Sequence, residues 1–476
     1  MFRSIDCPGG DSGLRWIRII LTVAFGMAWA CKGNADVVDD LVKRQLTEQK
    51  IPGAAIVVLK AGKIAKAGAY GLADMESAVP VTAETIFRIQ SMSKQFTAAG
   101  IMMLVEDGKL RLDEPAARYF DGAPGAWQKI TLRHLLTQTS GLRDFINEPT
   151  LELSRATTDE QLLASVANRP LKFAPGDAWD YSNTNYLLLG MIIRRVSGQW
   201  YGDFLAERIF RPLGMTRTSV IHEGENDPGR AKGYTLDNGR IRPSANLPSV
   251  VAGYGGGGIQ STVLDLAKWD AALYADKVLK RAMLDQMWTP VKLNNGTSHG
   301  YGFGWEIGEI AQHRWIWHAG KWNGFAAQID RFVDDRLTVI VLTNLAESAP
   351  ARVSRAIAGT FVPALAVPVY RPIPDSEPAV TARFFDVLRR GLEGGLRASE
   401  FTDPVWAYIA PRIDQMKRDF TALGAIQKLT LVERSENNGE RSYRYQARFG
   451  RTTMIFHFVL TKEDRIAVMT PELVNQ

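Results

Sequence analysis

Ser91 and Lys94 form the strongest chemical pattern in the chain, an S-x-x-K motif at the predicted start of a helix. Residues three apart share one face of a helix, so the lysine amine can reach the serine hydroxyl. A serine alcohol attacks a carbonyl only when a base takes its proton, and an amine can do so once burial lowers its pKa. The first turn of a helix also directs backbone N–H groups toward developing negative charge. Ser93 lacks such a partner, because Phe96 lies three residues later, so the pattern predicts acyl transfer through Ser91.

Two other serine patterns compete with this one. Residues 10–13 read G-D-S-G, as in the nucleophile loop of trypsin-like proteases, but they lie in a segment that we expect to be removed. Residues 296–300 read G-T-S-H-G, which matches the G-x-S-x-G of α/β-hydrolases. That motif works only on a sharp turn from strand to helix, and here residues 301–305 predict a strand. We therefore interpret Ser12 as a chance match and Ser298 as part of a surface loop.

Six segments that follow one another along the chain make the S-x-x-K motif specific. They are residues 87–97 (FRIQSMSKQFT), 135–142 (LLTQTSGL), 173–183 (from FAPG to Tyr181-Ser182-Asn183), 212–215 (PLGM), 257–262 (GGIQST) and 318–320 (HAG). In this order they resemble the serine β-lactamase and penicillin-recognising family, in its class C and β-lactamase-like carboxylesterase branch. Two positions depart from the β-lactamase pattern. Gln138 stands where relatives usually have histidine, and His318-Ala319-Gly320 replaces K-T-G, as H-x-G often does in esterase-like members.

The resemblance implies a role for each residue of the first two motifs. Ser91 would attack a carbonyl carbon and form an acyl-enzyme. Lys94 and Tyr181 would share the work of the general base, because a phenol next to an ammonium group ionises more easily. Asn183 would orient both the substrate and Lys94. Taken singly, Tyr181 also fits a buried aromatic residue and Asn183 a helix cap, but the order of the motifs favours the catalytic interpretation.

The third motif implies how the rest of a substrate is held. The backbone N–H groups of Ser91 and Lys321 would form the oxyanion hole, and Gly320 would let the substrate backbone approach its strand. Taken singly, His318 also fits a histidine of the protein core. In the family context it stands where β-lactamases have the lysine of K-T-G, so a group that is mostly neutral at pH 7 replaces a permanent cation. Lys321 cannot substitute for it, since side chains alternate along a strand. We therefore expect weak carboxylate recognition, stronger at about pH 5.5 than at pH 8, and faster hydrolysis of uncharged esters than of penicillins.

The elements predicted around these motifs place them in one α+β domain over residues 36–361. Helices are predicted over residues 36–49, 82–107 and 351–361, and strands over 54–59, 64–70, 314–330 and 337–342. Between these ends, up to about residue 290, short helices alternate with Pro and Gly. We expect an antiparallel β-sheet flanked by helices, completed by strands far apart in the sequence, with a mainly helical insert. The resemblance implies the same fold, that of serine β-lactamases and DD-peptidases.

Proline density marks the end of this domain. Five prolines fall between residues 363 and 378. They predict a semi-rigid linker over residues 362–378, because proline continues neither a helix nor a central strand. Residues 379–476 then predict a small C-terminal α+β accessory domain. Its helices are predicted over residues 379–390 and 411–420, and its antiparallel strands over 429–433, 442–449, 452–460 and 465–469.

The first 35 residues predict an export signal. Arg15 and Arg18 precede an apolar stretch of 12 residues, 19–30, which leads into small residues. Such a stretch is too short to cross a bilayer, which needs about 20 apolar residues. Cys31 could carry a lipid anchor, but Trp29 fits a lipoprotein signal poorly. We therefore expect cleavage and a mature protein in the periplasm or outside the cell, without a membrane span.

Composition excludes several other classes of function. The chain has 476 residues, 23% of them charged, and a formal net charge of +6 without a long basic run. This charge pattern lacks the clustered basic residues that are typical of nucleic-acid binding. Both cysteines lie in the predicted signal and the six histidines lack ligand spacing, so we expect no disulfide framework, metal or other cofactor. The expected partner is a small-molecule ester, D-amino-acid peptide or β-lactam, which the motifs do not separate. The alternatives are a penicillin-binding or cell-wall-sensing protein with little turnover and a true class C β-lactamase.

Overall fold

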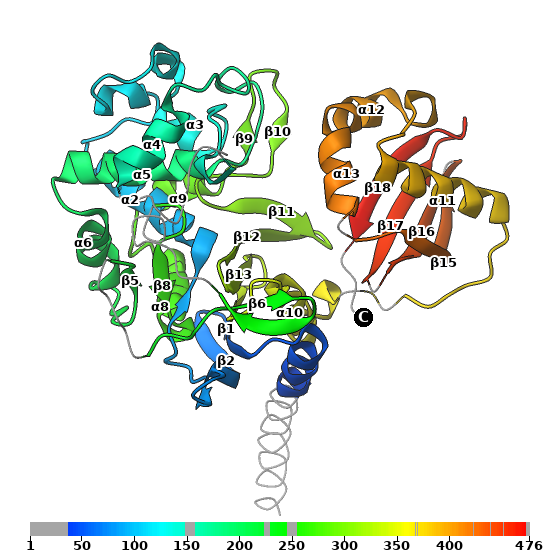
Figure 1. The fold of residues 1–476 in the computed structure, drawn as a ribbon, viewed down its shortest axis with the longest axis horizontal. Helices are drawn as coiled ribbons and strands as arrows, with labels where there is room; N and C mark the ends of the chain where they lie inside the picture. Colours follow the sequence, from blue (N-terminus) through cyan, green and yellow to red (C-terminus); the bar gives the residue numbers. More distant parts are fainter. Residues whose placement is uncertain are drawn as a thin grey trace, which may run out of the picture. The chain divides into compact units, whose positions relative to one another are not determined.

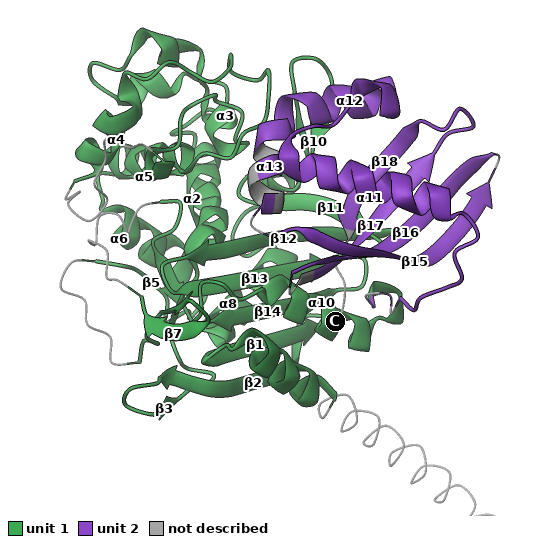
Figure 2. Ribbon diagram, turned by 45° about the vertical axis from the view of Figure 1, so that its right-hand side comes forward, with its two compact units in different colours: residues 1–365 green, residues 366–476 purple. Residues whose placement is uncertain are grey.

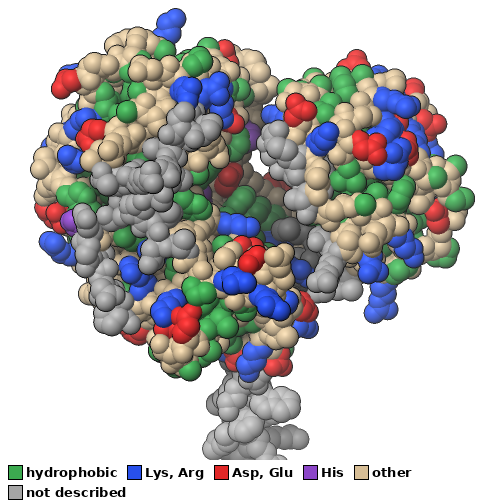
Figure 3. Space-filling model, in the orientation of Figure 1, with side chains coloured by type: hydrophobic (Ala, Val, Ile, Leu, Met, Phe, Trp, Pro, Cys, Tyr) green, Lys and Arg blue, Asp and Glu red, His purple; other side chains and the backbone are tan. Residues whose placement is uncertain are grey.

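The computed structural model of the chain describes residues 37–147, 158–222, 229–244, 255–366, 368, 370–421, 423–437, 439–450 and 452–472. The chain divides into two compact units, residues 1–365 and 366–476 (Figure 2). The predicted export signal lies outside the described residues. Among the helices that are described, none is both long and apolar enough to cross a membrane. On the face drawn in Figure 3, basic and acidic side chains of the first unit are interspersed rather than gathered by sign.

A seven-stranded antiparallel sheet forms the centre of the first unit (Figure 1), in the order β11-β12-β13-β14-β1-β2-β3, with all of these strands labelled in Figure 2. Its strands are β1 (Gly53–Lys60), β2 (Lys63–Asp74), β3 (Val79–Pro80), β11 (Glu306–Ile310), β12 (His313–Trp322), β13 (Phe325–Phe332) and β14 (Leu337–Thr343). β1 pairs with β14 from Ala54↔Thr343 to Lys60↔Leu337. The predicted antiparallel sheet, completed by segments from both ends of the domain, is therefore confirmed.

β1 reads GAAIVVLK without polar alternation because helices cover both faces of the sheet. Its even-numbered side chains from 54 to 58 pack with helical residues 37–49 and with α10 (Pro350–Phe361). Its odd-numbered side chains from 55 to 59 belong to the larger core, which includes α2 (Lys94–Glu106) and α8 (Val263–Tyr274). α2 is buried along nearly its whole length, and a helix that is apolar on all sides lies inside a protein.

The insert between β3 and β11 holds most of the remaining elements of the first unit. Its other α-helices are α3 (Leu132–Leu136), α4 (Asp159–Ala167), α5 (Asn183–Ser197), α6 (Tyr201–Leu205) and α9 (Arg281–Met287). Single turns of other helix types are η1 (Gln90–Ser93), η2 (Ala116–Tyr119), η3 (Gly125–Lys129), η4 (Phe145–Asn147) and η5 (Ala206–Phe210), with η6 (Pro363–Leu365) following α10. Among the short strands, β8 (Ile259–Ser261) lies between β4 (Phe87–Arg88) and β5 (Ser219–Val220) and pairs with both. β6 (Tyr234–Asp237) pairs with β7 (Arg240–Pro243), and β9 (Val291–Lys292) pairs with β10 (Ser298–His299).

Two predicted elements of this unit differ in the structure. The helix expected from residue 82 begins only at Lys94, because Phe87 and Arg88 pair with β8 and η1 follows them. The single strand expected over residues 314–330 is two strands, β12 and β13. They are joined at Asn323-Gly324, where φ is 44° and 86°. Positive φ at both central residues is the requirement of a tight hairpin turn, and Asn-Gly is the usual sequence for it.

The second unit is a four-stranded antiparallel sheet with helices, in the strand order β15-β16-β17-β18. Its elements are α11 (Pro378–Glu393), η7 (Ala398–Glu400), α12 (Asp403–Ile409), η8 (Ala410–Arg412), α13 (Ile413–Thr421), β15 (Ile426–Asn437), β16 (Glu440–Phe449), β17 (Thr452–Leu460) and β18 (Ile466–Glu472). α11 packs on the sheet through Phe384, which stacks on Phe458 with ring centroids 4.1 Å apart. The sequence predicted α11, α13 and all four strands but not α12, although Pro404 marks its first turn.

We expect the first unit to fold without the second. Leu365 is fully buried in the core beside β1, and its carbonyl accepts a hydrogen bond of 3.4 Å from Arg355. The described residues between 366 and 377 form no helix or strand. A chain that ends after Pro368 keeps the whole core, so it should stay soluble and show one cooperative thermal transition by circular dichroism. Aggregation of that shorter chain would contradict the boundary, and independent folding of residues 379–476 stays a prediction.

Candidate active site

The fold brings Ser91 and Lys94 together at the junction of η1 and α2. Lys94 Nζ donates a hydrogen bond of 3.0 Å to Ser91 Oγ, as the helical spacing predicted. Ser91 is partly exposed, whereas the Lys94 side chain is 0% exposed. Gln90, just before the serine, has φ of 50°, a left-handed conformation that costs energy in a residue other than glycine. The turn thus holds the hydroxyl at the surface and the amine beneath it.

Two further acceptors fix the amine of Lys94. Its Nζ donates to Asn183 Oδ1 at 3.0 Å and to the carbonyl oxygen of Gly256 at 2.8 Å. Asn183 is held in turn, because its Nδ2 donates to Asp144 Oδ2 at 2.9 Å. Burial lowers the pKa of Lys94 to about 7, against the opposing attraction of the Asp144 carboxylate. A neutral amine at this place has a lone pair that can accept the Ser91 proton.

Tyr181 lies beside the same pair. Its ring centroid is 4.8 Å from Lys94 Nζ, and its phenol lies close enough to Ser91 for the serine side chain to influence its pKa. Burial raises the pKa of Tyr181 well above its usual value. We expected the neighbouring ammonium to ease ionisation of this phenol, and the structure shows that burial outweighs any such effect. A protonated phenol at this place can donate or relay a proton, and the sharing of the general-base work between Lys94 and Tyr181 stays a prediction.

His318 of β12 is a buried neutral residue. Its Nδ1 lies 2.6 Å from the carbonyl oxygen of Ala319, and its Nε2 lies 3.3 Å from the hydroxyl of Tyr301. Because a carbonyl only accepts, Nδ1 carries the proton and Nε2 accepts from Tyr301. Burial, with a smaller effect of the Lys94 charge, lowers the pKa of His318 to about 3. Burial thus opposes the protonation of His318 on which the expected strengthening of carboxylate recognition near pH 5.5 was based, and the pH dependence of that recognition stays a prediction.

The end of β12 runs past the turn that carries the serine. β11 pairs with β12 only as far as Trp317. Beyond Trp317, β12 contacts the η1 turn. A Cβ on Gly320 would lie 2.1 Å from the carbonyl oxygen of Ile89. Gly320 is thus required for this close approach, a structural role that we did not predict. The Lys321 side chain is exposed while that of His318 is buried, as strand alternation predicted, and the oxyanion role of the Lys321 N–H stays a prediction.

Gln138 holds the segment that bears Tyr181 and Asn183. Its Oε1 accepts hydrogen bonds from the Ser182 N–H at 3.0 Å and from Asn185 Nδ2 at 2.5 Å. The side chain is fully buried. The residue that departs from the family pattern therefore acts as a positioning residue through its amide oxygen.

Several side chains near the site were missed by the sequence analysis. They are Asp144, which holds Asn183, Tyr301, which contacts His318, and Glu306 at the start of β11, whose charge acts on Tyr181. Burial raises the pKa of Glu306 to about 7. Its position directly after the G-F-G-W turn gave no chemical signal. Residues 301–305, which contain that turn, do not form the predicted strand, and Gly304 packs there against the Lys94 carbonyl.

Ser298 and Ser93 take no part in this arrangement, and Ser12 lies outside the described residues. Ser298 is exposed on the short strand β10. Ser93 is buried, and its Oγ accepts a hydrogen bond of 3.0 Å from the Ile259 N–H. Within the described residues no group of three His, Cys, Asp or Glu side chains comes together as metal ligands would.

Fold and site together define a serine hydrolase with the β-lactamase fold. Residues 38–362 match the family model described as Beta-lactamase, and the chain belongs to that family. Penicillin-binding protein 4* of Bacillus subtilis (strain 168) is 33% identical over 308 residues, which is 61% of this chain and 68% of that protein. The crystal structure of a D-amino acid amidase from Ochrobactrum anthropi SV3 is 26% identical with a TM-score of 0.57, covering 67% of this chain and 92% of the amidase.

A third similarity extends beyond the first unit. The octameric penicillin-binding protein homologue from Pyrococcus abyssi has a TM-score of 0.62 and covers 93% of this chain and 96% of its own. At 23% identity it shows a shared fold only.

Proposed function

We propose that the chain is an exported hydrolase that cleaves an ester or amide bond through an acyl intermediate on Ser91. One observation carries this proposal, the 3.0 Å contact between Ser91 Oγ and a buried Lys94 amine whose pKa is about 7. Near neutral pH a large share of such an amine is unprotonated and ready to act as a base. The N-terminal pattern of residues 1–35 supports the exported part, with a mature protein in the periplasm or outside the cell.

The acylation step follows from the contacts around Ser91. Neutral Lys94 takes the hydroxyl proton while Ser91 Oγ bonds to the carbonyl carbon. The oxygen of the tetrahedral intermediate faces the backbone N–H groups of Ser91 and Lys321. The bond to the leaving group then breaks, and the proton passes from Lys94 to that group through the phenol of Tyr181. Water attacks the acyl-serine in the second step, with the same groups moving the proton, and Ser91 is restored.

Intact mass spectrometry with substrate turnover tests this function. A fluorophosphonate should add one label to the full chain, and short-chain nitrophenyl esters should be hydrolysed continuously. D-Alanyl peptides, D-amino-acid amides and a penicillin complete the panel, because the relatives include proteins named for penicillin binding and D-amino acid amidase activity. A persistent penicilloyl mass without ester turnover would instead favour the penicillin-binding alternative. Absence of any label on the serine would overturn the proposal.

We expect uncharged esters to be better substrates than penicillins, because the catalytic centre offers a neutral His318 where β-lactamases have lysine. Replacing His318 with Lys should raise kcat/KM for a carboxylate-bearing ester relative to a matched neutral ester. A gained charged contact of about 1.5–3 kcal/mol corresponds to about 10- to 150-fold. The ratio of the two substrates cancels a general loss from the added buried cation. Faster wild-type hydrolysis of penicillin than of a short-chain nitrophenyl ester at pH 8 would contradict this account.

A further inference from the structure

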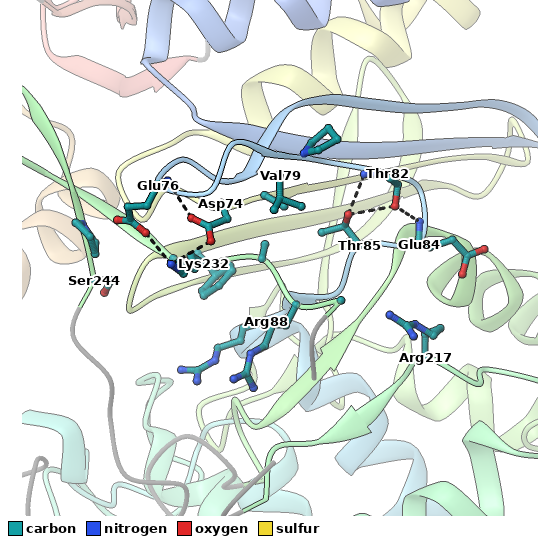
Figure 4. Close-up of a pocket in the computed structure, with 18 of the residues that line it drawn as sticks. Asp74, Glu76, Val79, Thr82, Glu84, Thr85, Arg88, Arg217, Lys232 and Ser244 are labelled. Carbon is teal, nitrogen blue, oxygen red and sulfur yellow. Dashed lines mark hydrogen bonds and ion pairs between the residues drawn. The ribbon is translucent and has the colours of Figure 1, made fainter. Parts of the chain in front are cut away.

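A pocket of ≈ 670 Å³ in the first unit gathers positive charge close to the nucleophile along the chain. Its lining includes Arg88, Arg217 and Lys232 (Figure 4), together with Arg230. Arg88 lies three residues before Ser91, so the two Cα atoms are within about 11 Å of each other. None of the groups assigned to catalysis above lines this pocket.

The small sheet β4-β8-β5 holds two of these arginines on one face. Arg88 of β4 is paired with Gln260 of β8, which is paired on its other side with Ser219 of β5. Residues directly opposite each other on antiparallel strands share a face of the sheet. The buried Gln260 amide donates to Ser219 Oγ at 3.0 Å and accepts from Arg230 Nη1 at 3.3 Å. The backbone of Arg230 is bridged to Ile86, so both arginines are fixed to the strand that leads to Ser91.

Lys232 at the other end of the pocket is already neutralised. Its Nζ lies 3.0 Å from Asp74 Oδ2 and 2.8 Å from Glu76 Oε2 (Figure 4). Arg88 and Arg230, by contrast, form no ion pair with any carboxylate in the part of the chain that the structure describes. Glu84 also lines the pocket, and it is exposed. Burial, with a smaller effect of the Arg230 charge, lowers the pKa of Arg88 to about 10, so the two like charges lie close enough to interact.

We propose that this pocket binds the oxyanion group of a small organic ligand, a carboxylate or a phosphate, between Arg88 and Arg230. Each guanidinium presents a planar fork of N–H donors that matches the two oxygens of such a group. An anion there would relieve the repulsion between the two arginines. The volume lies in the range of small-molecule sites, so it accommodates an organic body as well as the anionic group. This site is additional to the acyl-transfer centre and does not depend on its proposed chemistry.

Calorimetric titration of the full chain with inorganic phosphate and with succinate, at constant ionic strength, tests the site. We expect saturable binding of at least one probe, and an increase in thermal unfolding temperature with that probe. Arg88→Gln/Arg230→Gln should weaken binding by about tenfold or more, the effect of losing a charged hydrogen-bonded contact. The control Lys63→Gln/Lys109→Gln removes the same charge from exposed lysines outside the pocket and should bind as the wild type does.

Two kinetic measurements with the bound probe distinguish an anionic group of the substrate from a separate anionic ligand. If the anion belongs to the hydrolysed substrate, the bound probe raises KM for a carboxylate-bearing ester and leaves a neutral ester unchanged. If it belongs to a separate ligand, the probe changes kcat for the neutral ester. Should the double variant misfold, Arg88→Lys keeps the charge but loses the fork, and it should bind the probe more weakly than wild type. No saturable binding of either probe, or equal binding by the folded double variant, would overturn the proposal.

Discussion

Replacing Ser91 with alanine is expected to lower kcat/KM for a neutral nitrophenyl ester by about 10⁴-fold or more and to abolish fluorophosphonate labelling. The loss is large because nucleophile and base act as a unit, so removing one of them removes nearly all of the covalent route. Substitution of Oγ by hydrogen also leaves Lys94 with its other two acceptors, Asn183 and Gly256. The buried amine therefore stays satisfied, and the variant should fold like the wild type.

Ser298→Ala is the matched control for this variant. Ser298 lies in the G-x-S-x-G match of residues 296–300, yet it is exposed on β10, and we expect its removal to change the rate by no more than a factor of a few. Steady-state kinetics and intact-mass labelling on the two variants distinguish Ser91 from Ser298 as the nucleophile. An inactive Ser298→Ala beside an active Ser91→Ala would refute the assignment of the nucleophile.

The part of the site that could be predicted from the sequence is the part that local geometry sets. Ser91 and Lys94 meet because residues three apart share a helical face, and their contact needs no knowledge of the rest of the fold. Asp144 reaches Asn183 from 39 residues away, in a loop with no periodic pattern, so nothing in the sequence marks it. The same holds for Gln138, which could be recognised as a departure from the family order but not as the acceptor that holds Ser182 and Asn185.

The elements of the fold, too, include some that could be predicted from the local sequence and some that could not. The strands predicted over residues 54–59 and 337–342 are both present, and they pair with each other as β1 and β14. The helix start near residue 82 was misplaced because β4 is held by β8, a partner more than 170 residues away. The turn at Asn323-Gly324 could have been predicted, since Asn-Gly between apolar runs is a strong local hairpin signal.

Lys94→Met is expected to reduce kcat/KM for a neutral ester by about 10³-fold, within the range that a positioned general base contributes. Methionine keeps the length and the apolar stem of the side chain but cannot accept the Ser91 proton. The wild-type rate should rise as pH increases through about 7, where the pKa of Lys94 lies, and level off above it. The sign follows from the charge, because the protonated ammonium below that pH has no lone pair for the serine proton.

Glu306 provides the critical control, since its carboxyl group lies near Tyr181 and its pKa is also about 7. Ionisation of Glu306 would produce a transition in the same pH range by a different mechanism, through a negative charge that disfavours ionisation of the phenol. In Glu306→Gln the rise through about pH 7 should therefore remain, whereas in Lys94→Met it should vanish along with most of the rate. The pH dependence of kcat/KM for the three proteins separates these cases. A transition that survives in Lys94→Met and is absent from Glu306→Gln would assign the titration to the carboxyl group and remove Lys94 from the role of base.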